Sequence, residues 1–327
     1  MSELARVISN KTVEKFLTPE DVIKRIEDTW KWYGEGKIIM PPKITTDMEP
    51  AGVHGWFNSM PSYIGPAKTA GIKVVGGYSG NRKLGLPYIK ANILLTDPDT
   101  GVLRALIGAD WISNMRTGAQ PAIMGKYLAA KTDVVTIIGA GLQGWACLLC
   151  MSKTMDIREV RVCDIRPEAR ESFIARFAGY PFKMVSCATN EEGCRGSDII
   201  ITITTADAPL IREPWIKKGA LVMTMGSFTE TDADTVLKAD VIATDHIPQT
   251  LHRGNLKVLV EAGKISADSF DVVVPDLIAG KQTFQRRPDD RVCANIVGMG
   301  CLDVSVAALA YERIAQADAD TPVVDMD

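Results

Sequence analysis

Residues 134–144 read VVTIIGAGLQG, a β-branched apolar run that ends in the glycine pattern Gly139-x-Gly141-x-x-Gly144. A second short apolar run, VRVC, leads into Asp164 about 20 residues further along the chain. A strand, a glycine turn, a helix and a second strand that ends in an acid form the order of a dinucleotide-binding unit. This stretch therefore predicts the fold of the middle of the chain.

Each glycine of the pattern has a steric reason. Gly139 permits a tight turn, Gly141 lets the backbone approach a pyrophosphate, and Gly144 lets the helix pack closely on the strand. The helix that begins at Leu142 and Gln143 offers its first N–H groups and the positive end of its dipole to the phosphates. We therefore predict that all five residues contact a dinucleotide; a turn that is only structural is the alternative.

The acid after the second strand bears on which dinucleotide is bound. A carboxylate at position 164 accepts hydrogen bonds from a ribose diol and repels a 2′-phosphate, which favours NAD(H). Arg166, two residues on, keeps NADP(H) possible. Asp164, Ile165 and Arg166 are all counted among the predicted cofactor contacts.

Apolar runs and helical stretches alternate after the glycine turn. The pattern indicates an α/β fold, a doubly wound parallel sheet of the Rossmann type with helices on both faces. The predicted strands are 134–138, 159–163, 183–187, 198–203, 220–224 and 240–244, with helical or turn segments such as 142–153, 167–177 and 232–238 between them.

Ligands of such sheets bind beyond the carboxyl ends of the strands. Thr204 and Thr205 end the run DIIITITT, and Met225, Gly226 and Ser227 follow the next strand. We predict that these residues line the ribose and the nicotinamide. For the threonines the alternative is that they only favour strand formation.

The part before the glycine turn has a different pattern. Thr18-Pro19-Glu20-Asp21 is a helix start, and short β-like runs follow: GWFNSM, GIKVVGG, YIKANILLTD and VLRALIG. The turn 97–101 joins the last two runs. This predicts a mostly antiparallel sheet with one leading helix, followed by a helix over 112–129.

The end of the chain predicts a return to the first part. Residues 298–316 read as a helix, and the last ten residues, DADTPVVDMD, as a frayed end. We therefore expect a discontinuous α+β domain for substrate binding and dimerisation, 1–116 with 299–327. The dinucleotide-binding domain is expected at 117–298.

Three cations precede the dinucleotide site. Lys73 lies inside an apolar strand, where a charge is costly unless it faces a pocket or a partner. Arg116, in MRTGA, offers a bidentate fork suited to a carboxylate, and Lys43 adds a third charge after Pro41-Pro42. Together they suggest a small anionic substrate; the alternative is that each is a salt-bridged surface cation. Met60 and Phe228 are expected in the pocket walls.

Composition excludes several classes of function. The 327 residues are 46% hydrophobic and 24% charged, with net charge −3 and without a basic stripe, so nucleic acid is not an expected partner. No apolar run reaches the roughly 20 residues of a membrane helix. The seven cysteines have no framework spacing and the three histidines are scattered, so we expect a cytoplasmic protein without a metal.

The order of these motifs resembles the ornithine cyclodeaminase/μ-crystallin family. The resemblance rests on Lys73 in GIKVVGG, then LLTDPDTGVLRALIGADWISNMRTGAQPAIMGKYLA, then VVTIIGAGLQG, and covers about residues 18 to 315. It implies a homodimer whose substrate domains join their sheets, and NAD(H) or NADP(H) binding. It also implies that Lys73, Arg116 and Lys43 hold a substrate carboxylate. Thr117, in the same RTGA motif, is counted with the cofactor contacts.

The chain departs from the family pattern in two places. Cyclodeaminases carry an acid just after one strand of the sheet, in a pattern like GGDCPGK, and the matching position here is Phe228. Where many members read KSxG, this chain has Asn295-Ile296-Val297-Gly298. The first departure argues against deamination.

The leading hypothesis is therefore NAD(P)H-dependent reduction of a 2-imino acid, or the equivalent amino-acid dehydrogenation. Arg116 and Lys73 would hold the carboxylate, and Lys73 would also donate the proton if burial lowers its pKa. Glu230 or Asp232 is an alternative proton relay. Two other functions stay open: an ornithine or lysine cyclodeaminase with bound NAD, and a protein that binds NADPH and a small ligand without turnover.

Overall fold

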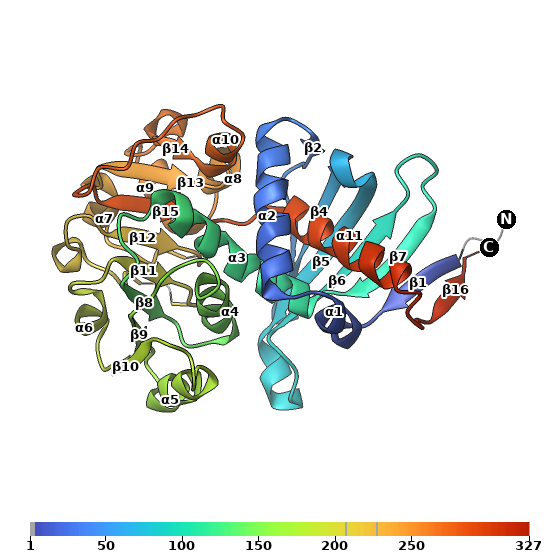
Figure 1. Cartoon of the computed structure of the whole chain (residues 1–327), viewed down its shortest axis with the longest axis horizontal. Helices are drawn as coiled ribbons and strands as arrows, with labels where there is room; N and C mark the ends of the chain where they lie inside the picture. The colour runs from blue at the N-terminus through green and yellow to red at the C-terminus, as the bar shows by residue number, and fades with distance from the viewer. Residues whose placement is uncertain (1–3, 207, 227, 327) are drawn as a thin grey trace. The chain divides into compact units, whose positions relative to one another are not determined.

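The computed structural model describes residues 4–206, 208–226 and 228–326 of the chain (Figure 1). The chain divides into two compact units. Unit 1 consists of Met1–Arg116 and Met299–Asp327, and unit 2 of Thr117–Gly298. The boundary falls inside one helix, α3 (Asp110–Leu128).

Unit 2 is a Rossmann-type parallel sheet with helices on its faces, which confirms the predicted fold class. The sheet order is β10-β9-β8-β11-β12-β15-β13-β14, and each pair of neighbours is parallel. The strand order reverses between β8 and β11, which is where such sheets bind their ligands. The strands are β8 (Val134–Ile138), β9 (Glu159–Cys163), β10 (Lys183–Cys187), β11 (Ile199–Thr202), β12 (Leu221–Thr224), β13 (Val241–Thr244), β14 (Val272–Val273) and β15 (Val292–Asn295).

Short helices connect these strands. The six strands expected from the sequence all form, with ends within one residue of the prediction. The short strands β14 and β15 were not predicted, and β15 inserts between β12 and β13. The helices of unit 2 beyond α3 are α4 (Leu142–Met151), α5 (Pro167–Arg176), α6 (Asn190–Cys194), α7 (Ala233–Leu237), α8 (Ile247–Thr250), α9 (Lys257–Glu261) and α10 (Val274–Ile278).

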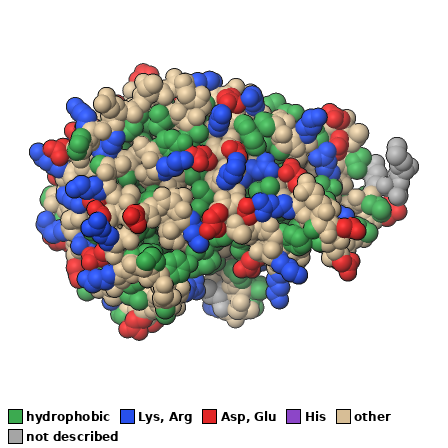
Figure 2. Space-filling model, in the orientation of Figure 1, with side chains coloured by type: hydrophobic (Ala, Val, Ile, Leu, Met, Phe, Trp, Pro, Cys, Tyr) green, Lys and Arg blue, Asp and Glu red, His purple; other side chains and the backbone are tan. Residues whose placement is uncertain are grey.

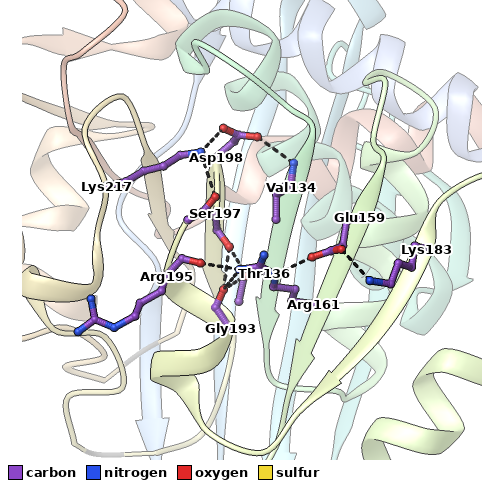
Figure 3. A network of polar contacts seen from close by, with 11 residues as sticks. Val134, Thr136, Glu159, Arg161, Lys183, Gly193, Arg195, Ser197, Asp198 and Lys217 are labelled. Carbon is purple, nitrogen blue, oxygen red and sulfur yellow. Dashed lines mark hydrogen bonds and ion pairs between the residues drawn. The ribbon is translucent and has the colours of Figure 1, made fainter.

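A polar network ties the amino ends of the central strands together (Figure 3). The Asp198 carboxylate accepts hydrogen bonds from Val134 N at 2.8 Å and from Lys217 Nζ at 2.6 Å. The buried hydroxyls of Thr136 and Ser197 lie 2.7 Å apart. Both oxygens of Asp198 thus have partners within unit 2, so we assign this network to the architecture of that unit.

Unit 1 is built on a mostly antiparallel sheet of order β16-β1-β7-β6-β5-β4-β2, with β3 paired to β4. Among the described strand pairs of this sheet, β1–β7 is parallel and the others are antiparallel. The turn over 97–101 joins β6 to β7, as the sequence predicts. The strands are β1 (Leu4–Ile8), β2 (Ile38–Ile39), β3 (Ile44–Asp47), β4 (Gly55–Ile64), β5 (Thr69–Tyr78), β6 (Ile89–Thr96), β7 (Leu103–Gly108) and β16 (Val323–Asp325).

Two helices, α2 (Pro19–Gly34) and α11 (Gly300–Gln316), lie in contact, and α11 packs on β4, β5 and β6 (Figure 1). The predicted start of α2 is confirmed, because Thr18 and Asp21 form a reciprocal capping box there. Thr29 of α2 donates a hydrogen bond of 2.7 Å to Ser305 of α11 within the buried contact. The helix expected over 298–316 therefore forms, and it packs within unit 1.

Two expectations for unit 1 are wrong. A short helix, α1 (Asn10–Phe16), precedes α2, so there are two leading helices. The last residues are not all frayed: β16 pairs antiparallel with β1, and Val7 N donates a hydrogen bond of 2.8 Å to Pro322 O. The sequence pattern misses β16 because a three-residue strand depends on its partner strand rather than on periodicity.

Several further features concern the described residues as a whole. None of their helices combines the length and apolar character needed to cross a membrane, and none of their His, Cys, Asp and Glu side chains group in threes that suit a metal ion. All seven cysteines are buried free thiols, including Cys147 and Cys150 in α4. On the face shown in Figure 2, basic and acidic side chains are interspersed.

Candidate functional site

The glycine turn has the geometry that a pyrophosphate requires. Gly139 has a φ of +112°, and a Cβ there would lie 2.5 Å from Ile203 O. A Cβ on Gly144 would lie 2.1 Å from Gly139 O, so helix and strand meet as closely as glycine allows. At Gly141, by contrast, a Cβ would meet nothing within 4 Å. Two glycines thus close the turn, and the third leaves open space beside the backbone.

The helix that follows the turn presents its amino end to that space. Gly141 is the N-cap of α4 and, as a glycine, has no side chain with which to cap the first turn of this helix. Leu142 and Gln143 are its first residues, and Leu142 is half exposed. Backbone N–H groups and the helix dipole at such an end favour an anion.

The acid at the end of β9 is held against the glycine turn. Asp164 Oδ2 accepts a hydrogen bond of 3.0 Å from Ala140 N, and Oδ1 accepts one of 3.0 Å from Arg166 N. Each carboxylate oxygen can accept further bonds from a diol. Ile165, beside it, is 97% exposed, which is unusual for a side chain of its size. An apolar side chain next to an acid that is predicted to bind a ribose suits the flat face of an adenine.

A buried glutamate joins the carboxyl ends of β11 and β12. Glu230 Oε1 accepts hydrogen bonds from Thr204 N at 2.9 Å and from the Thr204 hydroxyl at 3.1 Å. Glu230 Oε2 accepts from Thr202 Oγ1 at 2.9 Å and from Gly226 N at 2.8 Å. Burial raises the pKa of Glu230, and the four hydrogen bonds oppose that rise. These bonds shape the loops that the sequence assigns to the cofactor.

The other residues predicted at these strand ends have separate positions. Thr205 is exposed, and Met225 N donates to Thr202 O at 3.0 Å. Ser227 lies outside the described residues. Asp232, the alternative proton relay with Glu230, caps α7 by accepting a hydrogen bond of 2.9 Å from Thr235 N. Both acids of that alternative are therefore engaged in structural hydrogen bonds.

Taken together, unit 2 fits a dinucleotide. The open space at Gly141 and the amino end of α4 suit a pyrophosphate, and the exposed Ile165 beside Asp164 suits an adenosine.

Unit 1 contains a buried cluster of charges built on three elements. Lys73 of β5 is 1% exposed and Asp303 of α11 is 0% exposed. Lys73 Nζ lies 2.8 Å from Asp303 Oδ1, and Arg116 Nε, from α3, lies 3.0 Å from the same oxygen. We call Lys73, Arg116 and Asp303 the unit-1 cluster.

The cluster changes the acidity of its lysine. Burial lowers the pKa of Lys73 from 10.5 to about 7, with Arg116 and Lys43 contributing in the same direction and Asp303 opposing them. The Lys73 ammonium also donates a hydrogen bond of 3.4 Å to the Ser113 hydroxyl. A lysine with this pKa exchanges its proton near neutral pH, which suits a general acid or base.

The structure brings the three predicted cations together. Lys43, in the loop between β2 and β3, is close enough for its charge to act on Lys73. Met60 of β4 pairs across the sheet with Lys73 and is buried. Positive charges concentrated around one buried carboxylate are the arrangement expected of a site that binds an anionic substrate.

Asp303 was not predicted from the sequence. It stands inside GMGCLDVSVAALA, where it is the one charged residue of an otherwise apolar or small stretch. A single acid on the buried face of a helix signals a partner cation, and that signal was available. The identity of the partners depends on how α11 packs on β5, which periodicity does not reveal.

Two other predicted residues lie in unit 2. Thr117 follows Arg116 in α3, and Phe228, after β12, is 40% exposed. Gly118 of the RTGA motif lets the backbones of α3 and α4 pack closely. A Cβ at this position would lie 2.2 Å from Ala146 O of α4. The roles of Thr117 in cofactor binding and of Phe228 and Met60 in substrate binding stay predictions.

Comparison with known proteins agrees with this site. The family model of the ornithine cyclodeaminase/mu-crystallin family matches residues 4–318. The alanine dehydrogenase of Archaeoglobus fulgidus is 28% identical over 312 residues, 94% of each chain. The Δ1-pyrroline-2-carboxylate reductase of Thermococcus litoralis, solved with NADH and L-proline, superposes with a TM-score of 0.92. It is 28% identical, over 98% of this chain and 100% of that one.

A third relative is an archaeal alanine dehydrogenase dimer with bound NAD, with a TM-score of 0.92. It is 26% identical, over 99% of this chain and 100% of that chain. All three names are those of a dehydrogenase or a reductase, and both solved structures contain a nicotinamide cofactor. The resemblance expected from the sequence is confirmed: the chain belongs to the ornithine cyclodeaminase/mu-crystallin family.

Proposed function

We propose that this protein reduces a small 2-imino acid with NADH, and runs the reverse amino-acid dehydrogenation when the amine is in excess. The observation that carries the proposal is the buried Lys73, whose pKa of about 7 suits proton exchange and whose partners, Asp303 and Arg116, converge on it. Relatives of similar length that act as alanine dehydrogenase and pyrroline-2-carboxylate reductase support the same reaction class.

The three cations of unit 1 have separate roles in the proposed reaction. Arg116 binds the substrate carboxylate, with Lys43 adding to the positive field. The Lys73 ammonium gives one proton to the imine nitrogen, which becomes an iminium, and Lys73 becomes a neutral amine. Hydride addition to the iminium carbon then yields the amine, and Lys73 recovers a proton from solvent. NADH, held by unit 2, supplies the hydride.

We propose NAD(H) rather than NADP(H) as the preferred cofactor. A 2′-phosphate at the end of β9 would meet the Asp164 carboxylate, which the backbone of Ala140 and Arg166 holds in place. Arg166 is half exposed and 3.5 Å from Asp164, so it leaves some affinity for NADP(H). The cofactors in the two solved relatives, NADH and NAD, support this choice.

We also propose that the protein is a homodimer through unit 1. Val7 and Leu106 are paired across β1 and β7 and are 36% and 40% exposed, whereas the neighbouring pair Ile8 and Ile107 is buried. A sheet face with exposed aliphatic pairs suits a second copy of the chain. Sedimentation should show a dimer that Leu106→Glu weakens, and a monomeric wild type would contradict the proposal.

The function is tested by an oxidation screen. Loss of NADH or NADPH is followed with 2-oxo acids plus ammonia or methylamine, and with cyclic imino acids. We expect NADH oxidation with at least one imine. Arg116→Ala should lower kcat/KM about 100- to 1000-fold, because a buried charge loses its partner, and should leave NADH affinity unchanged.

The control is Arg104→Ala, which removes another arginine of unit 1, paired with Asp97. It should keep full activity. Full activity of Arg116→Ala would contradict the carboxylate site. Conversion of ornithine to proline without net NADH would indicate a cyclodeaminase, and tight nucleotide binding without any turnover would indicate a binding protein.

A further inference from the structure

Only one of the two oxygens of the Asp303 carboxylate has partners among the described residues. Its Oδ1 receives both Lys73 Nζ and Arg116 Nε, at 2.8 and 3.0 Å. Its Oδ2 is buried and has no hydrogen-bond partner among the residues that the structure describes. A buried charged oxygen without a donor is costly, and native structures keep one only where something else satisfies it.

Two other buried carboxylates show what a structural role looks like. Glu230 and Asp198 each receive donors on both oxygens. At Asp303 the two nearest donors share one oxygen although a second lies on the same carbon. Within the described part of the chain, Asp303 therefore lacks a hydrogen-bond donor for its second oxygen, Oδ2.

A bound substrate can supply the missing donor. The Arg116 side chain is 13% exposed, so it is the member of the unit-1 cluster that a ligand meets first. In a 2-imino acid the nitrogen stands one carbon away from the carboxylate. An acid bound to Arg116 therefore brings its nitrogen close to the carboxylate that Arg116 itself contacts.

Resting on the proposed function, we propose that Asp303 Oδ2 accepts the N–H of the bound substrate, so that the unit-1 cluster favours amines and iminium ions, including the iminium that Lys73 forms by protonation, over 2-oxo acids. A protonated imine has an N–H to donate. The carbonyl oxygen of a 2-oxo acid has none, and would place a lone pair against a carboxylate oxygen. Asp303 is then a specificity-determining residue as well as the group that positions Lys73.

The test compares two planar acids of the same shape on the NADH-loaded wild-type protein. Pyrrole-2-carboxylate carries a ring N–H where furan-2-carboxylate carries an oxygen lone pair. Calorimetry should show the pyrrole acid binding about 10- to 100-fold more tightly, since a site built to accept an N–H is left unsatisfied by the analogue that lacks it. Equal binding of the two acids would overturn the proposal.

Asp303→Asn sharpens the comparison. The amide can keep an oxygen towards Lys73 and Arg116 while it places an NH2 group where Oδ2 stood. We expect the preference for the pyrrole acid to fall to about threefold or less. Persistence of the full preference in a folded Asp303→Asn protein would overturn the assignment to Oδ2, and the wild-type comparison stands even if this variant does not fold.

Arg116→Ala separates this inference from the proposed function. It should abolish binding of both acids and leave NADH affinity unchanged. If neither acid binds to the wild type while NADH does, the carboxylate site fails and the inference fails with it. If both bind equally and both need Arg116, the carboxylate site stands and only the role of Asp303 is refuted.

Discussion

Glu230 in unit 2 and Asp303 in unit 1 are both 0% exposed carboxylates, but their surroundings differ. Glu230 receives four hydrogen bonds, two on each oxygen, from residues at the carboxyl ends of β11 and β12. Asp303 receives two cations on one oxygen and nothing described on the other. A satisfied carboxylate holds a structure together, whereas a half-satisfied one beside cations is prepared for a ligand.

The largest expected effect comes from the lysine of the unit-1 cluster. Lys73→Met should lower kcat/KM for imine reduction by about 100- to 10,000-fold, because the proposed general acid is lost. In the wild type, reductive kcat/KM should fall as the pH rises through about 7, where Lys73 loses its proton. Steady-state pH profiles of both proteins check this. Lys24→Met, on the exposed face of α2, is the control and should change neither.

The same lysine has a consequence for stability. Its pKa is lowered from 10.5 to about 7 in the folded protein, so between these values the unfolded chain binds more protons. The free energy of unfolding therefore gains a contribution that grows as the pH rises from 7 to 10.5. Urea unfolding at pH 7 and pH 9 should show a larger gain for the wild type than for Lys73→Met. An equal gain in the free energy of unfolding for both proteins would contradict a lowered pKa of Lys73 in the folded state.

Asp164 is intermediate between the two carboxylates, because it is bonded to the glycine turn yet lies beside an exposed Ile165. Asp164→Ser should raise the ratio of kcat/KM with NADPH to that with NADH about 10- to 100-fold, since a charged hydrogen bond to the ribose is lost. Adding Arg166→Ser should remove part of the gain. An unchanged ratio would mean that Asp164 only supports the turn.

Glu230→Gln tests the structural member of the comparison. The amide turns one acceptor into a donor that faces another donor, which costs about 1–3 kcal/mol of stability. We expect a lower Tm and NADH affinity weakened about tenfold, with pyrrole-2-carboxylate still bound. If the affinity for pyrrole-2-carboxylate fell and the affinity for NADH did not, the assignment of Glu230 to the cofactor loops and of Asp303 to the substrate would be wrong.

The smallest effect on activity is expected at Asp198, at the opposite ends of the strands (Figure 3). Asp198→Asn should lower the free energy of unfolding by about 1–2 kcal/mol, because the amide accepts less strongly from Val134 N and Lys217. Both kcat and NADH affinity should stay within about twofold of the wild type. Urea unfolding and kinetics on one preparation check both parts.

Much of unit 2 could be predicted because its signals are local. A β-branched run followed by three spaced glycines is constrained by backbone geometry, so the turn, α4 and the strand ends agree with the expectation. β15 was missed although it is as long as β11, β12 and β13, because its place between β12 and β13 is set by pairing. Short strands depend on partners far away in the sequence.

The site in unit 1 was only half predictable. A lysine inside an apolar strand and an arginine followed by small residues mark themselves as candidates by their cost of burial. Which carboxylate they share depends on α11, almost 200 residues beyond Arg116, and on how its first turn packs against β5. No local pattern contains that information.

The sequence by itself determined the dinucleotide turn, the alternation of strands and helices and the unusual cations, because each follows from local sterics, periodicity or the cost of a buried charge. Only the tertiary structure decided that Lys73 and Arg116 meet on one oxygen of Asp303 and that Thr204 donates hydrogen bonds to Glu230. The physical reason is that the energy of a buried charge depends on the groups that packing brings within hydrogen-bond distance, whatever their separation along the chain.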